Sequence, residues 1–298
     1  MTDATSRICG GMVGESGSAV PVEGVAMTAI GVAVIRAHES QRADRLYLDP
    51  LAQAFVDAAR EGFSAERWAS LLELADQFYE GRSVAVRLVD DRVRDAVNAG
   101  IEQIVIVGSG LDTRAFRMEL PTKVTVFEID LPELFVFKER VLADQATSPT
   151  CRRRVVAADL REDWTTPLRE SGFDPDAPTL WVDEGALAFL PPDPRRDAVV
   201  TLTQLSAPGS RFGVSRYSVD GNSAPYKGLR SMVGSSASGD APLRETVNDV
   251  RDWLDSLGWD TEFQSWNDAV RRLDRAVAKA DSEIGHVAAV RRSGVHPA

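Results

Sequence analysis

The run 101–107 (Ile-Glu-Gln-Ile-Val-Ile-Val) is rich in β-branched residues and leads directly into Gly108-Ser-Gly110. A strand that is apolar toward both faces belongs in the interior of a parallel sheet. A strand that runs into Gly-x-Gly and then a helix brings backbone N–H groups close to a ligand at the N-terminus of that helix. On its own, Gly-x-Gly is equally typical of an ordinary tight turn between a strand and a helix.

Strand and helix patterns alternate along the rest of the chain. Strand patterns occupy 124–129, 154–158, 179–182 and 211–215, helical patterns occupy 131–145, 193–206 and 243–257, and 259–263 and 284–290 supply two last strands. This alternation predicts an α/β fold with a doubly wound, mainly parallel sheet. Upstream, helical periodicity at 22–40, from about Asp49-Pro50, at 65–78 and at 83–99 predicts an N-terminal helical cover over 22–99.

The length of 298 residues fits one large domain with appendages or two smaller domains. Residues 1–21 are rich in Gly, Ser and Thr without periodicity, so we expect a disordered tail followed by a single domain over 22–298. Within that domain, the Gly- and Ser-rich segment 221–240 is typical of a disordered loop or of a mobile cover over a site.

Charge and cysteine content exclude several classes of function. The formal net charge is −11, and the densest basic run is Arg152-Arg153-Arg154, which argues against nucleic acid as the partner. Cys9 and Cys151 show no metal-ligand spacing, so we expect neither a metal site nor a structural disulfide. No signal peptide and no apolar run long enough for a bilayer is evident, which predicts a cytoplasmic protein with no membrane partner. Nothing in the sequence indicates an oligomeric state.

The glycine pattern itself discriminates between cofactors. Turns that bind dinucleotides carry a third glycine, as G-x-G-x-x-G, so that the helix approaches the pyrophosphate closely. The third position here is Thr113. This difference favours an adenosyl cofactor without phosphates over a nicotinamide dinucleotide.

Acidic residues follow the next strands, at the edge where ligands of open α/β sheets bind. Asp130 ends the second strand, where a carboxylate accepts hydrogen bonds from ribose hydroxyls. Asp159 follows the third strand, and its carboxylate suits an adenine amino group while Leu160 offers an apolar face to the ring. Asp183-Glu184 follows the fourth strand. Each acid alone is also typical of a solvated loop, but the ordered set favours a binding site.

The sequence resembles the leucine carboxyl methyltransferase family, and more closely its actinobacterial branch of S-adenosylmethionine-dependent and polyketide-type O-methyltransferases. The motifs that carry the resemblance lie at 22–30, 108–117, 127–132, 158–161, 183–191 and 205–210. The similarity extends from about 22 to 292, nearly the whole chain. It implies a Rossmann-like class I methyltransferase domain that uses S-adenosylmethionine.

The resemblance also implies roles for the residues that match the family motifs. In each case the role is contact with one part of the cofactor. Gly108 and Gly110 line the cofactor, Asp130 holds the ribose, Asp159 and Leu160 hold the adenine, Glu184 lies near the sulfonium or the amino-acid end, and Arg87, with Arg82 as the alternative, binds the methionyl carboxylate.

The chain departs from the family at this last contact. The family branch often has Arg-Thr-Arg before Asp-Asp, whereas this chain reads Ala85-Val-Arg87-Leu-Val-Asp-Asp91. Because the first arginine is missing, the identity of the residue that binds the methionyl carboxylate stays open. An ion pair between Arg87 and Asp91, one helical turn later, is the structural alternative.

Methyl transfer from a sulfonium is an in-line displacement that requires alignment and exclusion of water. A carboxylate acceptor is already an anion, whereas an alcohol or phenol favours a general base. His286, at the last predicted strand, is interpreted as structural, and His296 lies in the tail. His38 remains as the candidate base, with an exposed or supporting side chain as the alternative. Arg36, on the same predicted helix, is the candidate cation for an acceptor carboxylate, with an exposed or structurally paired side chain as the alternative.

These observations predict an S-adenosylmethionine-dependent O-methyltransferase that acts on a carboxylate or hydroxyl of a small molecule, such as a secondary metabolite. The scarcity of bases favours a carboxylate. An NAD-dependent oxidoreductase on the same sheet and a methyltransferase for the C-terminal carboxylate of a protein are the alternatives within the enzyme class. A non-catalytic binding protein is a further alternative, because a fold alone does not define a function.

Overall fold

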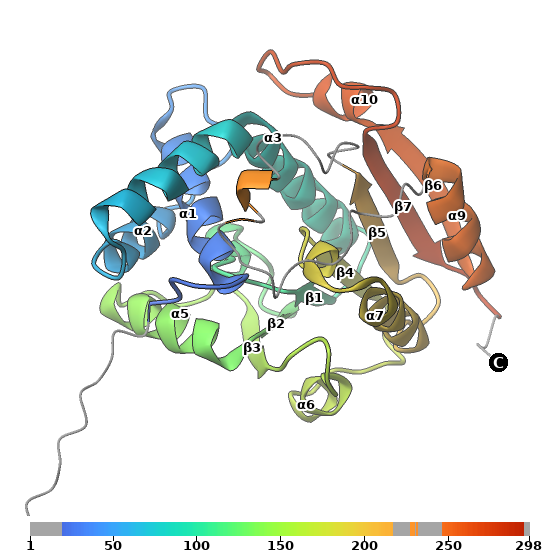
Figure 1. Cartoon of the computed structure of the whole chain (residues 1–298). Coiled ribbons are helices and arrows are strands. Elements are labelled where there is room, and N and C mark those ends of the chain that lie inside the picture. Colours follow the sequence, from blue (N-terminus) through green and yellow to red (C-terminus); the bar gives the residue numbers. More distant parts are fainter. Residues whose placement is uncertain (1–19, 217–226, 230, 232–245, 295–298) are drawn as a thin grey trace, which may run out of the picture.

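A seven-stranded sheet runs through the centre of the computed structural model, which describes residues 20–216, 227–229, 231 and 246–294 (Figure 1). The strands are β1 (Gln103–Val107), β2 (Thr125–Asp130), β3 (Arg152–Ala157), β4 (Thr179–Asp183), β5 (Arg211–Arg216), β6 (Trp259–Ser265) and β7 (Gly285–Arg291). Their order is β3-β2-β1-β4-β5-β7-β6. Strands β1–β5 pair in parallel, and β7 is antiparallel to both β5 and β6. The predicted doubly wound, mainly parallel α/β fold is confirmed.

Strand register brings the predicted strand ends to one edge of the sheet. Val107, the last residue of β1, lies opposite Ile129 of β2 and Asp183 of β4. Asp130 of β2 in turn lies opposite Ala157, the last residue of β3. The glycine turn and the acidic residues therefore follow the sheet at the same carboxyl edge.

Three helices form the N-terminal cover at this edge: α1 (Ala26–Gln41), α2 (Ala52–Arg60) and α3 (Ala65–Asn98). In Figure 1, α1 and α2 lie at the left, and α3 runs from there to the centre of the molecule. The two helices expected at 65–78 and 83–99 are one continuous helix. A glycine inside a helix costs only about 1 kcal/mol, and the buried residues on both sides of Gly81 offset that cost. Ser64 caps the helix by accepting a hydrogen bond from the N–H of Arg67 at 3.3 Å.

Further helices occur among the described residues. They are α4 (Arg114–Arg117), α5 (Pro132–Asp144), α6 (Thr165–Glu170), α7 (Pro192–Gln204), α9 (Val247–Ser256), α10 (Trp266–Val270) and the 3-10 helix η1 (Leu187–Phe189). Helices α6, α7 and α9 share one apolar cluster with the sheet, and the second half of α3 packs with α4 in the cluster on the other face. The short helices α6 and α10 were not predicted, because each is too brief to display a helical period.

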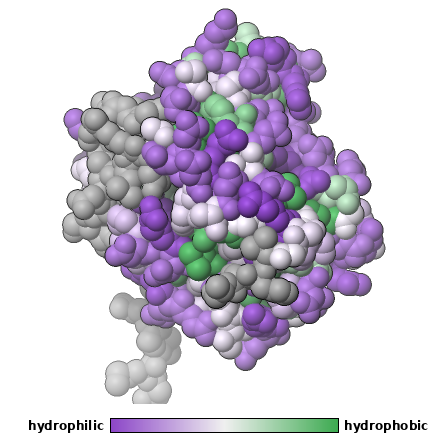
Figure 2. All heavy atoms as spheres, turned by 90° about the vertical axis from the view of Figure 1, so that its right-hand side faces the viewer, coloured by the Kyte–Doolittle hydropathy of each residue, from purple (hydrophilic) through white to green (hydrophobic). Residues whose placement is uncertain are grey.

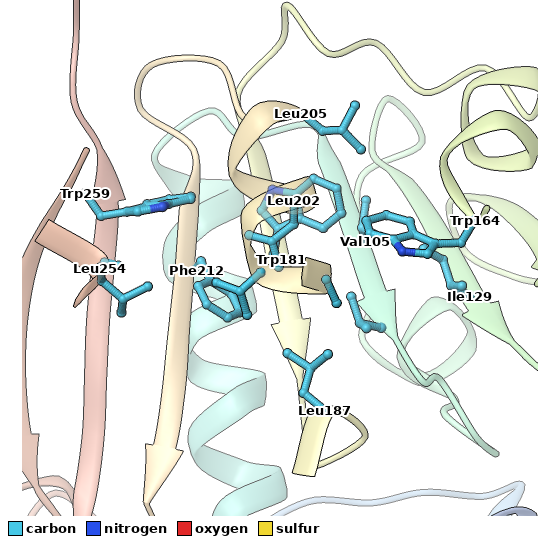
Figure 3. Packing of buried hydrophobic residues seen from close by; sticks show 14 of the residues in the cluster. Val105, Ile129, Trp164, Trp181, Leu187, Leu202, Leu205, Phe212, Leu254 and Trp259 are labelled. Atoms are coloured by element: carbon cyan, nitrogen blue, oxygen red, sulfur yellow. The ribbon is translucent and has the colours of Figure 1, made fainter. Parts of the chain in front are cut away.

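Large aromatic side chains fill the cluster beneath α6, α7 and α9 (Figure 3). The ring centroids of Trp164 and Trp181 lie 6.2 Å apart, and those of Phe212 and Trp259 lie 6.1 Å apart. Each buried indole N–H has a partner: Trp181 donates to Ser206 at 2.9 Å, and Trp259 donates to a threonine hydroxyl at the same distance. Apolar burial therefore dominates this part of the core.

The surface over α9, β6 and β7 is mainly hydrophilic, with small separate hydrophobic areas (Figure 2). Within the described ranges, no helix combines the length and the apolar character needed to cross a membrane.

Some sequence-based predictions fall on residues outside the described ranges. These are the tail 1–21 except for its last two residues, the loop 221–240 except for 227–229 and 231, the beginning of the helix predicted at 243–257, and His296. The division of the chain into tail, cover and loop therefore stays a prediction.

Candidate functional site

Gly108 and Gly110 form the turn that follows β1, and both have positive φ, at 63° and 52°. A Cβ atom on Gly108 would lie 2.1 Å from the Cβ of Ala186, which follows β4. A Cβ on Gly110 would lie 3.2 Å from the Cβ of Ala29 on α1. Glycine is thus required here by the left-handed backbone and by the close approach of two other segments.

Asp130 holds this turn from the neighbouring strand. Its Oδ2 accepts the N–H of Gly110 at 2.6 Å, and its Oδ1 accepts the N–H of Leu131 at 2.7 Å. Burial raises the pKa of Asp130, and the two N–H groups oppose that rise. Because a carboxylate has about four acceptor positions, Asp130 retains acceptor capacity beyond these two bonds.

Asp159 and Leu160 follow β3 at the same edge. The carboxylate of Asp159 accepts hydrogen bonds at 2.9 Å from the backbone N–H and the Nε of Arg161. These bonds to Arg161 hold the pKa of Asp159 below its usual value. Leu160 is half-buried and packs against the aromatic cluster.

Asp183 and Glu184 follow β4. Oδ1 of Asp183 accepts the N–H groups of Gly185 at 3.1 Å and Leu187 at 3.2 Å, and burial raises the pKa of this carboxyl. Asp183 therefore shapes the turn that carries Glu184. The carboxylate of Glu184 pairs with Arg114.

Arg114 is the centre of a buried ion cluster that the sequence analysis missed. Its side chain is 2% exposed, and it contacts Asp112, Glu184 and Asp90 of α3, with 2.8 Å between its Nε and Oδ1 of Asp90. Arg117 adds two bonds to Asp90, at 2.6 and 2.8 Å. Burial opposes ionisation of Asp90, but the two arginines offset burial and hold its pKa below the usual value. The cluster fastens α3 to the helix after the glycine turn and to the end of β4.

Arg87 and Arg82 point to different partners. Arg87 donates to both carboxylate oxygens of Asp91, at 3.0 and 3.1 Å, and to the carbonyl oxygen of Leu46 at 2.9 Å. The ion pair considered as the structural alternative for Arg87 is therefore present. Arg82 instead donates to the carbonyl oxygen of Glu184 at 2.8 Å, and its Nη1 lies 4.0 Å from the Glu184 carboxylate. Arg82 is the arginine that reaches the carboxyl edge.

Arg36 is buried and engaged within the protein. It is 4% exposed and donates to Asp49 at 2.8 Å, to the hydroxyl of Thr113 at 3.3 Å and to the carbonyl oxygen of Leu111 at 2.6 Å. The structurally paired alternative therefore describes Arg36 in this structure, and its predicted contact with an acceptor carboxylate stays a prediction. Sequence reasoning had no signal for these bonds, because the partners lie up to 77 residues away.

The two described histidines occupy different environments. His38 is exposed, and its ring stacks on Tyr79 with 4.5 Å between the centroids. The hydroxyl of Tyr79 donates to Glu39 at 2.6 Å. His286 is buried on β7, where its Nδ1 lies 3.3 Å from the hydroxyl of Ser215. Burial holds the pKa of His286 well below its usual value, so its imidazole is neutral.

Known proteins share this fold and sequence pattern. The family model for leucine carboxyl methyltransferase matches residues 29–203. A "putative S-adenosyl-L-methionine-dependent methyltransferase" of Mycobacteroides abscessus is 36% identical, over 88% of this chain and 92% of its own. One of that name from Frankia alni is 35% identical over 92% of both chains. A solved structure of a "putative methyltransferase" from Thermobifida fusca superposes with a TM-score of 0.55 at 19% identity, covering 94% of this chain and 100% of its own.

The sheet, the glycine turn and these relatives define an S-adenosylmethionine-dependent methyltransferase with the class I fold. The chain belongs to the leucine carboxyl methyltransferase family. The adenosyl cofactor, which Thr113 at the third glycine position favours, is thereby confirmed. These relatives do not support the alternative of an NAD-dependent oxidoreductase.

Proposed function

We propose that the carboxyl edge of β1–β4 holds S-adenosylmethionine, and that the chain transfers its methyl group to an oxygen of a small molecule. The donor is held by residues from all four strand ends. Gly108 and Gly110 line the adenosyl group, Asp130 binds the ribose, Asp159 and Leu160 bind the adenine, Glu184 lies at the amino-acid end, and Arg82 binds the methionyl carboxylate.

The position of Asp130 is the observation that carries the donor site. Its carboxylate lies against the glycine turn, 2.6 Å from the N–H of Gly110, and its remaining acceptor positions fit a ribose diol. A second observation supports the fit. The hydroxyl of Ser109, between the two glycines, is buried without a hydrogen-bond partner among the described residues. A buried hydroxyl without a partner is unfavourable, so a polar ligand atom at this turn would relieve a cost.

Asp159 is bonded to Arg161, and that pair must open before the carboxylate accepts from an adenine amino group. The Arg161 side chain is 56% exposed. Ion pairs at such positions contribute only about 0–1 kcal/mol, so opening this one is a minor cost. Leu160 already lies against the apolar cluster, which suits one face of an adenine ring.

Arg82 is the better candidate than Arg87 for the methionyl carboxylate. Arg87 already has a carboxylate partner and a carbonyl partner away from the strand ends. The guanidinium of Arg82, on α3, reaches the end of β4, where its Nη2 is 3.7 Å from the position of a Cβ on Gly185. Its side chain is 30% exposed, so its remaining N–H groups stay available to a ligand.

When bound, S-adenosylmethionine supplies a methyl group on a sulfonium, which an oxygen nucleophile attacks in line. The protein's task is to hold the donor, align the acceptor and exclude water. Glu184, after β4, and Arg82, on α3, orient the amino-acid end of the cofactor. The N-terminal cover lies over the strand ends. No proton needs to be removed when the acceptor is a carboxylate.

A carboxylate acceptor is favoured by the state of the described candidate bases. His286 is buried and bonded to Ser215. The hydroxyl of Tyr79 donates to Glu39, and burial together with this hydrogen bond raises the pKa of Tyr79. His38 remains as a base only for an alcohol or phenol. We therefore propose a small carboxylic acid as the preferred acceptor.

A screen for methyl transfer from labelled S-adenosylmethionine tests this proposal. It compares small carboxylic acids, phenols and a peptide with a free C-terminal leucine, each with the native chain and with His38→Ala. We expect methyl esters of small acids and an unchanged rate with His38→Ala. Methylation of phenols alone, abolished by His38→Ala, would show that the carboxylate preference is wrong. Methylation of the peptide alone would establish a protein C-terminus as the acceptor.

A further inference from the structure

Thr113, at the position of the third glycine, is fully buried between two charged side chains. Its hydroxyl donates to Oδ2 of Asp49 at 2.7 Å and accepts from Nη1 of Arg36 at 3.3 Å. Arg36 belongs to α1, and Asp49 precedes α2. The residue that departs from the dinucleotide-binding pattern is thus the point where the cover joins the glycine turn.

The guanidinium of Arg36 bonds to the backbone of this turn. Its Nη2 donates to the carbonyl oxygen of Leu111 at 2.6 Å, directly after Gly110, while its Nη1 pairs with Asp49 at 2.8 Å. Oδ1 of Asp49 also accepts the N–H of Leu51 at 3.2 Å, at the beginning of α2. One carboxylate and one guanidinium therefore connect α1, α2 and the glycine turn.

The turn is consequently held from two sides. Asp130 bonds to the N–H of Gly110 from the sheet, and Arg36 bonds to the carbonyl oxygen of Leu111 from the cover, each at 2.6 Å. Glycine loses more conformational freedom on ordering than any other residue. Contacts that order such a turn before the ligand arrives lower the entropic cost of binding.

We infer that Arg36, Asp49 and Thr113 form a positioning cluster that sets the affinity for the adenosyl cofactor by fixing the glycine turn from the cover. The inference rests on the proposed function, since it requires the cofactor to bind at this turn. Arg36 then acts on the cofactor through the backbone of Leu111 and touches neither donor nor acceptor.

The same helix provides a matched control in Glu39, three residues beyond Arg36. Glu39 is fully buried and bonds to Tyr79, to the N–H of Leu46 and to Arg275, with distances of 2.6, 2.6 and 2.9 Å. None of these partners belongs to residues 108–114. Loss of its charge therefore weakens the packing of α1 without releasing the glycine turn.

The experiment measures the dissociation constant of S-adenosylhomocysteine by calorimetry, together with amide hydrogen exchange of residues 105–118 in the free protein. It uses the native chain, Thr113→Val, Thr113→Ser, Arg36→Lys and Glu39→Gln. Thr113→Val keeps the shape and removes the hydroxyl, so we expect about tenfold weaker binding and faster exchange in the turn. Thr113→Ser restores both values. Glu39→Gln lowers the melting temperature and leaves the dissociation constant within about twofold.

Arg36→Lys keeps the charge but loses the forked geometry that spans Leu111 and Asp49, and it serves as the second variant if Thr113→Val does not fold. Its expected effect is at least as large as that of Thr113→Val. Failure of the native chain to bind S-adenosylhomocysteine would reject the proposed donor site itself. Binding by the native chain with unchanged affinity and exchange in both variants, or with an equal change in Glu39→Gln, would overturn the positioning role alone.

Discussion

The contact between the cover and the glycine turn differs from the aromatic cluster beneath α6, α7 and α9 in the interactions that stabilise it. The cover contacts the glycine turn and α4 through buried charged side chains: Arg36 bonds to Leu111 and Thr113, and Asp90 pairs with Arg114 and Arg117. The aromatic cluster consists of apolar side chains, with Trp181 and Trp259 among the largest fully buried residues (Figure 3). Apolar packing is non-directional, whereas hydrogen-bonded charges fix the positions of particular atoms. The contact with the glycine turn thus relies on directional bonds, whereas the aromatic cluster relies on apolar burial.

The largest expected effect comes from breaking the ion cluster of Arg114. Asp90→Ala leaves Arg114 and Arg117 buried without this carboxylate, so we expect the free energy of unfolding to fall by about 3–5 kcal/mol. Asp91→Ala is the matched control on the same helix. Its side chain is 39% exposed and pairs with Arg87 and Arg94 at the surface, so its loss costs about 0–1 kcal/mol. Urea unfolding measures both, and equal losses would contradict a special role for the buried cluster.

A substitution in the aromatic cluster should separate stability from binding. Trp181→Phe removes part of a ring that is 2% exposed and the hydrogen bond to Ser206. We expect a loss of about 2 kcal/mol in unfolding free energy, with the affinity for S-adenosylhomocysteine unchanged. Unfolding curves and calorimetry provide the two measurements. A marked loss of affinity with an intact fold would show that the two regions are coupled.

An effect no larger than this concerns His286, on β7 beside β5, and appears as pH dependence. Burial, and secondarily the charge of Arg92, keeps the pKa of His286 far below its usual value, so the native imidazole is neutral. The unfolded chain takes up this proton below about pH 6.5. Stability is therefore complete above that pH and is lost as pH falls, by up to about 1.4 kcal/mol per pH unit. Unfolding of the native chain and of His286→Gln at about pH 7 and about pH 5 measures this slope. An equal slope in both would exclude His286 as its source.

Local patterns in the sequence predicted most strands of the sheet but not the contacts between residues that are distant in the sequence. The β-branched run before Gly108 and the acids after the next strands located β1–β4 and their shared edge. Strand direction is not encoded in such a pattern, so the antiparallel pairing of β7 emerged only from the structure. The ion clusters also escaped prediction, because Arg114 pairs with residues 24 and 70 positions away. Nothing in the spacing of those residues indicates that they meet.

Calorimetry with S-adenosylhomocysteine and NAD tests most directly whether the carboxyl edge is the donor site. It uses the native chain and Asp130→Ala, with thermal unfolding as the control for an intact fold. We expect the native chain to bind S-adenosylhomocysteine and not NAD. Asp130→Ala should bind about tenfold more weakly or worse, because bonds to a charged carboxylate contribute about 1.5–3 kcal/mol each. An unchanged dissociation constant in folded Asp130→Ala, or binding of NAD alone by the native chain, would contradict the proposal that the carboxyl edge is the donor site.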